Sequence, residues 1–169
     1  MKKTVLKYGG YGLITAAVLF FLALTFGKSL SYSAQEVIGY ASMIASLSFI
    51  FFGIKHYRDK VNNGAVSFGK ALVIGLLISA LTGLGIAMVD YIYTTVINPD
   101  FASEYLEVTL KTYESTYSGA ELEAKKAELT QQMQDYGGSG FMAALMFVTV
   151  VLIGFVLSLI SALILQRKK

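Results

Sequence analysis

Two carboxylates lie in or beside apolar segments, where an acid can bind a cation or transfer a proton. Asp90 falls inside the apolar run 71–97, and Glu36 directly precedes the run 37–54. Ionisable residues inside membrane spans are rare and are usually functional. However, Ala71 and Asp90 are 19 residues apart, a helical rise of about 28 Å, which places Asp90 at the far edge of the hydrocarbon. We therefore expect a solvated or hydrogen-bonded acid, and the alternative is an ion or proton site at Asp90 and Glu36.

The single histidine, His56, lies in a cluster of charged residues, KHYRDK, directly after an apolar run. A zinc site needs several thiolate, imidazole or carboxylate ligands. The chain has one histidine and no cysteine, so almost nothing remains to form such a site. The sequence also lacks a nucleotide-binding loop, a nucleophile elbow and the paired intramembrane acids of a protease. We therefore expect a non-enzymatic protein with no catalytic residue, metal or cofactor.

The apolar residues form long blocks of the kind that cross membranes. Hydrophobic residues make up 55% of the 169 residues and charged residues only 15%, against about 25% charged residues in a soluble domain. A spanning helix needs about 20 apolar residues, and four runs approach or exceed this length: 8–26, 37–54, 71–97 and 141–165. None shows the alternation of a membrane β-barrel. The sequence predicts an all-α integral membrane four-helix bundle that forms one domain over residues 1–169.

The first run also has features of a signal peptide, because three lysines precede it and a small-x-small site can be drawn through Ser31 and Ser33. Two observations oppose cleavage. The apolar stretch is long for a signal peptide, and Lys28 lies between it and the site. We interpret the run as the first span and keep a cleaved signal peptide as the alternative.

The basic residues predict the orientation, because lysine and arginine concentrate on the cytoplasmic side. With four spans, ten of the fourteen basic residues fall on one side. We therefore predict cytoplasmic termini, an extracytoplasmic segment 98–140 and a bacterial inner-membrane location. Because the basic residues are divided among short segments, we expect contact with the lipid bilayer and no binding of nucleic acid. The predicted anchors are Lys55, Arg58, Lys60, Arg167, Lys168 and Lys169.

Tyrosines flank the predicted spans in the pattern of an aromatic belt. The chain has no tryptophan, so tyrosine takes this position. We expect Tyr8, Tyr11 and Tyr57 near the inner boundary, and Tyr32, Tyr40, Tyr91 and Tyr93 near the outer one.

The segment between the third and fourth runs carries eight acids and three lysines, a net charge of −5. Asn98-Pro99 is a typical helix start, and Ser118 with Glu121 has the spacing of a capping box for a second helix. Glu121 and Lys125 are spaced for an ion pair on one helix face. We predict an acidic helical segment within the membrane domain, and leave open whether it packs on the membrane or on a partner.

Small residues recur every four positions in the third run and, over a shorter stretch, in the fourth. Such stripes permit close contact between helices in lipid. We predict a helix-packing interface, within the bundle or between copies, formed by Ala71, Gly75, Ser79, Gly83, Ala87, Gly154, Ser158 and Ala162.

Three stretches of the chain, SLSFIFFGIKHYRDKVNNGAVSFGKALVIGLLIS, NPDF and SLISALILQRKK, resemble a bacterial family of four-span inner-membrane proteins of unknown function, domain-of-unknown-function family 4199. The most recognisable part runs from Phe51 to Ala71. The resemblance implies a four-helix membrane fold and an inner-membrane location. It implies no activity and no functional residue.

The expected role is that of a non-enzymatic integral membrane protein that acts through helix packing, as an accessory or scaffold subunit with a membrane-protein partner or as a homo-oligomer. The small-residue stripe supports this interpretation. The alternative is a small transporter or channel with a path near Asp90.

Overall fold

The computed structural model describes residues 1–27, 30 and 32–167, apart from the side chains of Tyr32, Ser33 and Glu36. Within these residues the chain is helical, with one isolated β-bridge and no strand. The chain divides into two compact units, one formed by Met1–Val89 with Met146–Lys169 and the other by Asp90–Leu145. The predicted all-α fold is confirmed.

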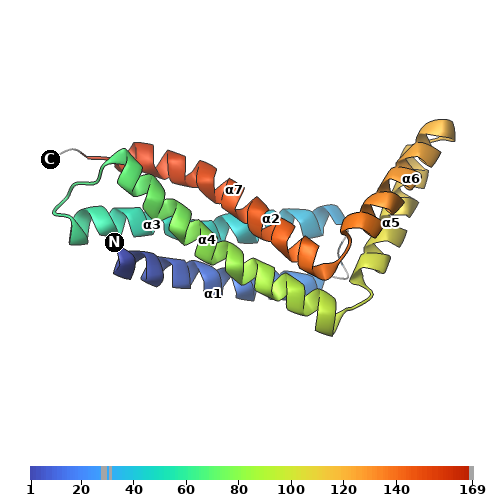
Figure 1. Ribbon diagram of the computed structural model, residues 1–169, viewed down its shortest axis with the longest axis horizontal. Helices are drawn as coiled ribbons and strands as arrows, with labels where there is room; N and C mark the ends of the chain where they lie inside the picture. The colour runs from blue at the N-terminus through green and yellow to red at the C-terminus, as the bar shows by residue number, and fades with distance from the viewer. Residues whose placement is uncertain (28–29, 31, 168–169) are drawn as a thin grey trace. The chain divides into compact units, whose positions relative to one another are not determined.

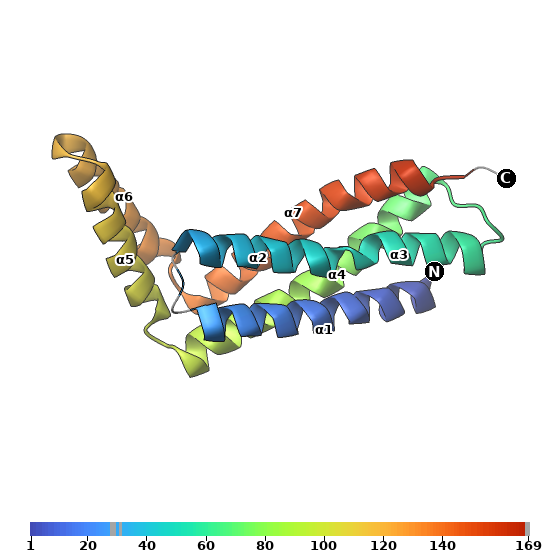
Figure 2. The same ribbon diagram turned by 180° about the vertical axis from the view of Figure 1, so that it is seen from behind.

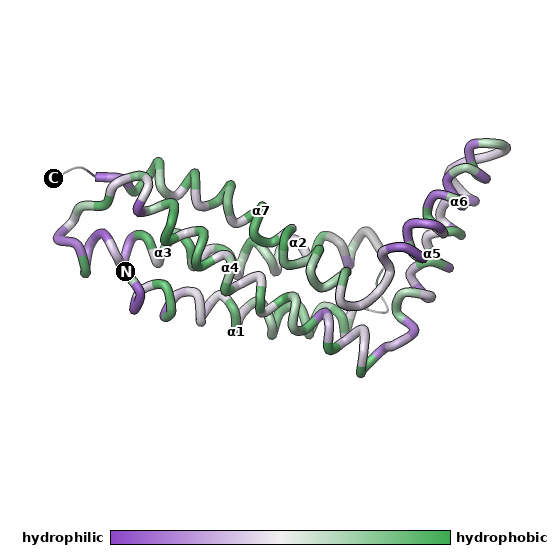
Figure 3. The backbone as a smooth tube through the Cα atoms, in the orientation of Figure 1, coloured by the Kyte–Doolittle hydropathy of each residue, from purple (hydrophilic) through white to green (hydrophobic). Residues whose placement is uncertain are grey.

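Four helical stretches are long and apolar enough to cross a membrane: Lys2–Phe26, Val37–Val61, Phe68–Ile97 and Ser139–Leu165. They contain α1 (Lys2–Phe26), most of α2 (Tyr32–Leu47), α3 (Phe49–His56), η2 (Tyr57–Val61), α4 (Phe68–Ile92), η3 (Tyr93–Ile97) and α7 (Ser139–Leu165). Figure 3 shows the apolar colouring along these helices, which gives way to hydrophilic residues in the α3–α4 connection.

All four spans are longer than predicted, the first two by the most. The first helix begins at Lys2 rather than near residue 8, and the second continues past Ile54 to Val61. Lysine and arginine are good helix formers, so the basic flanks extend the helices beyond the apolar runs that the hydropathy pattern detects.

In the first unit, α1 packs along α2 and α3, and the three helices lie side by side in Figures 1 and 2. The core is formed by aliphatic side chains from α2, α3, α4 and α7, of which Leu47, Ile50, Ile54, Ile74, Ile78 and Val150 are 0% exposed. This core fixes the positions of the small residues discussed below.

The second and third spans both end in a π-helical turn. The Asn62 amide donates to the Tyr57 carbonyl at 3.0 Å, and the Asn98 amide donates to the Tyr93 carbonyl at 2.7 Å. Each turn begins with a buried tyrosine, since Tyr57 and Tyr93 are only 6% and 2% exposed. The prediction that these two tyrosines belong to an aromatic belt is therefore wrong, because their rings pack within the protein.

The second unit contains η3 and the hairpin of α5 (Phe101–Thr116) and α6 (Gly119–Tyr136), which lie against each other. The predicted start of α5 is wrong by two residues, because Asp100 is the N-cap. Asn98 instead opens a turn in which the Phe101 amide donates to its carbonyl, and Pro99 suits the second position of that turn. The Asn98 side-chain amide donates to Glu104 Oε2 at 2.8 Å.

The start of α6 differs from the predicted capping box. Ser118 is the N-cap, but its side chain makes no capping hydrogen bond within the described chain. The next residue, Gly119, has φ +59°, so the backbone enters the helix from the left-handed region. Lys125 pairs with Glu128 at 2.9 Å rather than with Glu121, because residues three apart also share a helix face.

Candidate functional site

The small-residue stripes of α4 and α7 face each other within one chain. A Cβ added to Gly75 would lie 2.7 Å from Ser158 Cβ, and one added to Gly154 would lie 2.9 Å from Ser79 Oγ. Real Cβ atoms essentially never come so close to another heavy atom. The contacts are thus reciprocal, because a glycine of each helix receives a serine of the other.

The remaining members of the predicted interface surround this contact. Ala71 and Ala162 are fully buried, and Ala87 is half-buried. A Cβ on Gly83 would lie 3.1 Å from the Phe147 ring. The part of α4 up to Val89 also packs on α1, where Gly12 faces the Thr82 hydroxyl and Gly85 faces the Leu13 backbone.

The contact at Gly85 was missed in the sequence, because Gly85 is out of register with the four-residue stripe and lies on another face of α4. Its signal is the second glycine two residues after Gly83. Two glycines at this spacing permit close approach on two faces of one helix. In the first unit, α4 therefore contacts both α1 and α7 through positions without a side chain.

Several buried hydroxyls of this bundle donate to carbonyls of their own helices. Ser46 donates to the Ser42 carbonyl at 2.8 Å, Thr82 to Ile78 at 3.0 Å and Ser158 to Gly154 at 2.6 Å. Such bonds to the preceding turn satisfy the hydroxyl donor without an interhelical partner. These side chains fill narrow spaces between the helices rather than form a reactive group.

Asp90 lies in the last turns of α4 and is only 6% exposed. Its Oδ2 atom is buried and has no hydrogen-bond partner among the described residues, and its backbone carbonyl accepts from Thr94 at 2.8 Å. The expectation of a solvated or hydrogen-bonded acid is wrong for this oxygen, because helical rise determines depth and not the direction in which a side chain faces. Glu36, its predicted neighbour, has a side chain outside the described residues.

His56 lies at the seam between α1 and α3, with its ring 5.3 Å from the ring of Tyr8. Its Nδ1 atom is buried without a hydrogen-bond partner in the described part of the chain. Among the described residues, no group of three or more histidine and acidic side chains could hold a metal ion.

The connection from α3 to α4, the N-terminus of α1 and the end of α7 lie at the same end of the bundle (Figure 1). Arg58 donates to both carboxylate oxygens of Asp59, at 2.6 and 3.1 Å, and to the Leu165 carbonyl at 3.4 Å. Val66 and Arg167 form an antiparallel bridge through backbone bonds of 3.0 and 2.8 Å. Lys55 and Lys60 are exposed, and Lys168 and Lys169 lie outside the described residues.

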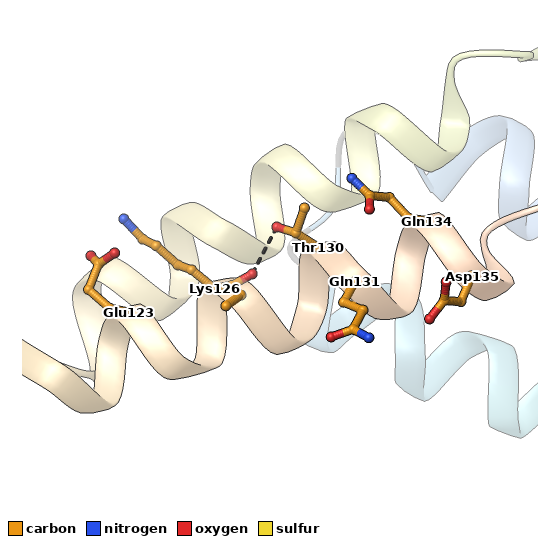
Figure 4. A pocket seen from close by; sticks show the side chains of 7 residues that line it. Glu123, Lys126, Thr130, Gln131, Gln134 and Asp135 are labelled. Carbon is orange, nitrogen blue, oxygen red and sulfur yellow. Dashed lines mark hydrogen bonds between the residues drawn. The ribbon is translucent and has the colours of Figure 1, made fainter.

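The hairpin presents a polar groove of about 600 Å³ on α6. Figure 4 shows the side chains along this face, where Thr130 donates to the Lys126 carbonyl at 2.8 Å. The lining residues are Glu123, Lys126, Ala127, Thr130, Gln131, Gln134 and Asp135. An extended polar face of this kind suits a partner surface rather than a small apolar ligand.

All three lysines of the hairpin are paired with acids. Lys126 reaches from α6 to Glu114 of α5 at 2.7 Å, and this hydrogen bond lowers the pKa of Glu114. The other pairs are Lys111–Glu107 and Lys125–Glu128. Among the described residues, five hairpin acids have no lysine partner within 4.0 Å: Asp100, Glu104, Glu121, Glu123 and Asp135.

A family model described as protein of unknown function (DUF4199) matches residues 7–167. The match covers nearly the whole chain and confirms the predicted membership in this domain-of-unknown-function family. Neither a curated protein nor a solved structure matches this chain.

Proposed function

This chain belongs to the DUF4199 family of proteins of unknown function, and we propose that it is a non-enzymatic accessory subunit that binds a membrane-protein partner through the α5–α6 hairpin. In this proposal the four spans anchor the chain in the bacterial inner membrane. The termini face the cytoplasm, and the hairpin lies on the opposite side.

The observation that carries the proposal is the distribution of charge on the hairpin. Its lysines are already paired, and five acids remain without a lysine partner among the described residues. Complementary charge directs association and selects partners. The occupant that fits is therefore a basic extracytoplasmic segment of another membrane protein, which would contact Glu123 and Asp135 along the groove on α6.

The contacts of the small residues also support partner binding by the hairpin rather than by the spans. Because Gly75, Ser79, Gly154 and Ser158 pack on one another within the chain, these positions are occupied before any partner helix arrives. A second copy is also a poor occupant for the hairpin, since its own hairpin carries the same net negative charge and would be repelled.

The test is purification from the native membrane in a gentle detergent, followed by identification of copurifying proteins. We expect the double variant Glu123→Gln, Asp135→Gln to lose the partner by tenfold or more. The matched control is Glu107→Gln, Glu128→Gln, which removes the same charge from the hairpin outside the proposed contact. Equal loss in both variants, or a second copy of the chain as the sole partner, would contradict the proposal.

The second candidate function is a small transporter or channel, favoured by the buried and unpartnered Oδ2 atom of Asp90. Ionisable groups at such positions typically mark ion or proton pathways. The test is proton or cation flux into liposomes that contain the purified protein. Flux that disappears in Asp90→Asn and persists in Asp100→Asn supports the transporter, and absence of flux in the wild type excludes it for the ions tested.

A further inference from the structure

We propose that the groove between the start of α4 and the end of α7 binds the phosphate of an anionic phospholipid. The groove has a volume of about 420 Å³ and is lined by Val66, Ser67, Phe68, Gly69, Gln166 and Arg167. This inference is independent of the proposed partner, because it concerns residues of the first unit and none of the hairpin.

The lining of the groove is amphipathic. Val66 and Phe68 supply apolar walls, whereas Ser67, Gln166 and Arg167 supply hydroxyl, amide and guanidinium groups. A phospholipid has the same division, since its phosphate needs donors and its glycerol and upper acyl carbons need apolar contact. A guanidinium is also the side chain best suited to hold two phosphate oxygens at once.

The groove lies at headgroup depth. It is bordered by Phe68, where the third candidate span begins, and by Gln166, which directly follows the end of the fourth at Leu165. Two apolar helices that stop at the same place mark the edge of the hydrocarbon. Lipid phosphates lie just outside this edge, so the ligand is already present in the membrane next to the groove.

The charges around the groove leave Arg167 available. Asp59 is the acid of this loop, and Arg58 already binds both of its oxygens. The charge of Arg167 attracts that of Asp59, but Arg167 forms no ion pair within 4.0 Å of another described residue. Its backbone is fixed by the bridge to Val66. The Arg167 backbone is therefore held at the rim of the groove while its side chain is exposed. Lys70 adds a second exposed positive charge on the first turn of α4.

The test is lipid binding by the full-length protein in detergent, measured by native mass spectrometry and by thermal melting. Phosphatidylglycerol, phosphatidylcholine and inorganic phosphate serve as the three probes. We expect phosphatidylglycerol to bind the wild type and to raise its melting temperature more than the other two. Arg167→Gln should weaken binding about tenfold, the loss expected for one charge-assisted hydrogen-bonded contact.

The matched control is Lys60→Gln, which removes one exposed positive charge from the same end outside the groove. A second variant tests occupancy without a change of charge. Gly69→Phe fills the groove from a position whose Cβ meets no atom within 4 Å, and Gly10→Phe is its control in equally open space on α1. We expect Gly69→Phe to prevent phosphatidylglycerol binding and Gly10→Phe to leave it unchanged.

Three outcomes would overturn the proposal. Equal weakening by Arg167→Gln and Lys60→Gln would show general attraction to basic residues rather than a site. Equal binding of phosphatidylcholine would remove the dependence on net lipid charge, and equal stabilisation by inorganic phosphate would identify a free anion as the ligand. If Arg167→Gln does not fold, normal phosphatidylglycerol binding by Gly69→Phe would still show that the groove is not the lipid-binding site.

Discussion

The two units of this chain are stabilised internally by different kinds of contact. In the first unit, glycines of α4 and α7 receive serines of the opposite helix, and several core side chains are completely buried. In the hairpin of the second unit, α5 has no buried residue and α6 has one, Leu129. The bundle thus depends on close complementary shape, whereas the hairpin depends on a thin apolar seam with ion pairs at its surface.

This difference indicates where each unit tolerates change. A densely packed interior is destabilised by even one added carbon atom, so the bundle tolerates few substitutions at its glycine contacts. Exposed ion pairs contribute little and can be rearranged, so the hairpin surface can change its partner contacts at small cost. The proposed accessory role fits this contrast, because the membrane anchor tolerates few substitutions in its interior whereas the binding surface tolerates many.

The largest effect is expected from Gly154→Leu, because the new side chain would overlap Ser79 of α4. Overpacking of a filled interior costs about 1–3 kcal/mol, and the absence of free space here favours the upper end. The measurement is thermal melting in detergent, followed by circular dichroism. The control is Gly140→Leu on the same helix, where an added Cβ meets no atom within 4 Å. Equal destabilisation of both variants would show that tight contact is not what holds the bundle.

A smaller and local effect is expected from Leu129→Ala in the hairpin. Removal of a buried leucine side chain costs about 2 kcal/mol at the lower end of the usual range, which applies to Leu129 because it is 8% exposed. Leu129 is the one buried residue of α5 and α6. We expect faster proteolysis within residues 101–136 and an unchanged melting temperature of the bundle. Leu122→Ala, at a half-buried position of the same helix, is the control. A fall in the melting temperature of the bundle would show that the stability of the bundle depends on the hairpin, and would contradict the prediction.

The spans were predictable because hydropathy is a property of composition, and long apolar runs have few alternative structures. The stripe of α4 was also visible, since its period is that of a helix face. The sequence did not show which helix would cover the stripe, because small residues in α1, α2 and α7 fit equally well. That choice depends on all helices packing together.

Asp90 and the two π-helical turns show a second feature that the sequence alone does not predict, the burial of individual side chains. Helical rise predicts how far Asp90 lies along the helix but not its burial, because exposure depends on neighbouring elements. Tyr57 and Tyr93 are aromatic residues near span ends, and the sequence pattern of a buried tyrosine there is the same as that of a lipid-facing one. The extra residue in a π turn rotates the following side chains, and nothing in the local sequence announces it.

The hairpin should respond to pH through Glu114 and Lys126. The hydrogen bond from Lys126 lowers the pKa of Glu114 below its ordinary value of 4.5, so the pair stabilises the hairpin above that value. The stabilisation is lost as the pH falls through the folded pKa. We expect protease susceptibility of residues 101–136 to rise as the pH falls below the ordinary glutamate pKa of 4.5 while the bundle melts as before. Lys126→Met should reduce this pH dependence, and an unchanged profile in that variant would assign it to other acids.

The smallest effect separates two ion pairs of similar length. Lys126–Glu114 joins α6 to α5, whereas Lys111–Glu107 lies within α5 at i,i+4 with both side chains largely exposed. Only the first pair resists separation of the helices, since the second persists when the hairpin opens. We therefore expect Lys126→Gln to increase proteolysis of the hairpin modestly and Lys111→Gln to leave it unchanged. Salt should reduce the difference, because screening weakens exposed pairs. If both variants are cleaved faster by the same amount, the hairpin is stabilised by the helicity of α5 rather than by contact between α5 and α6.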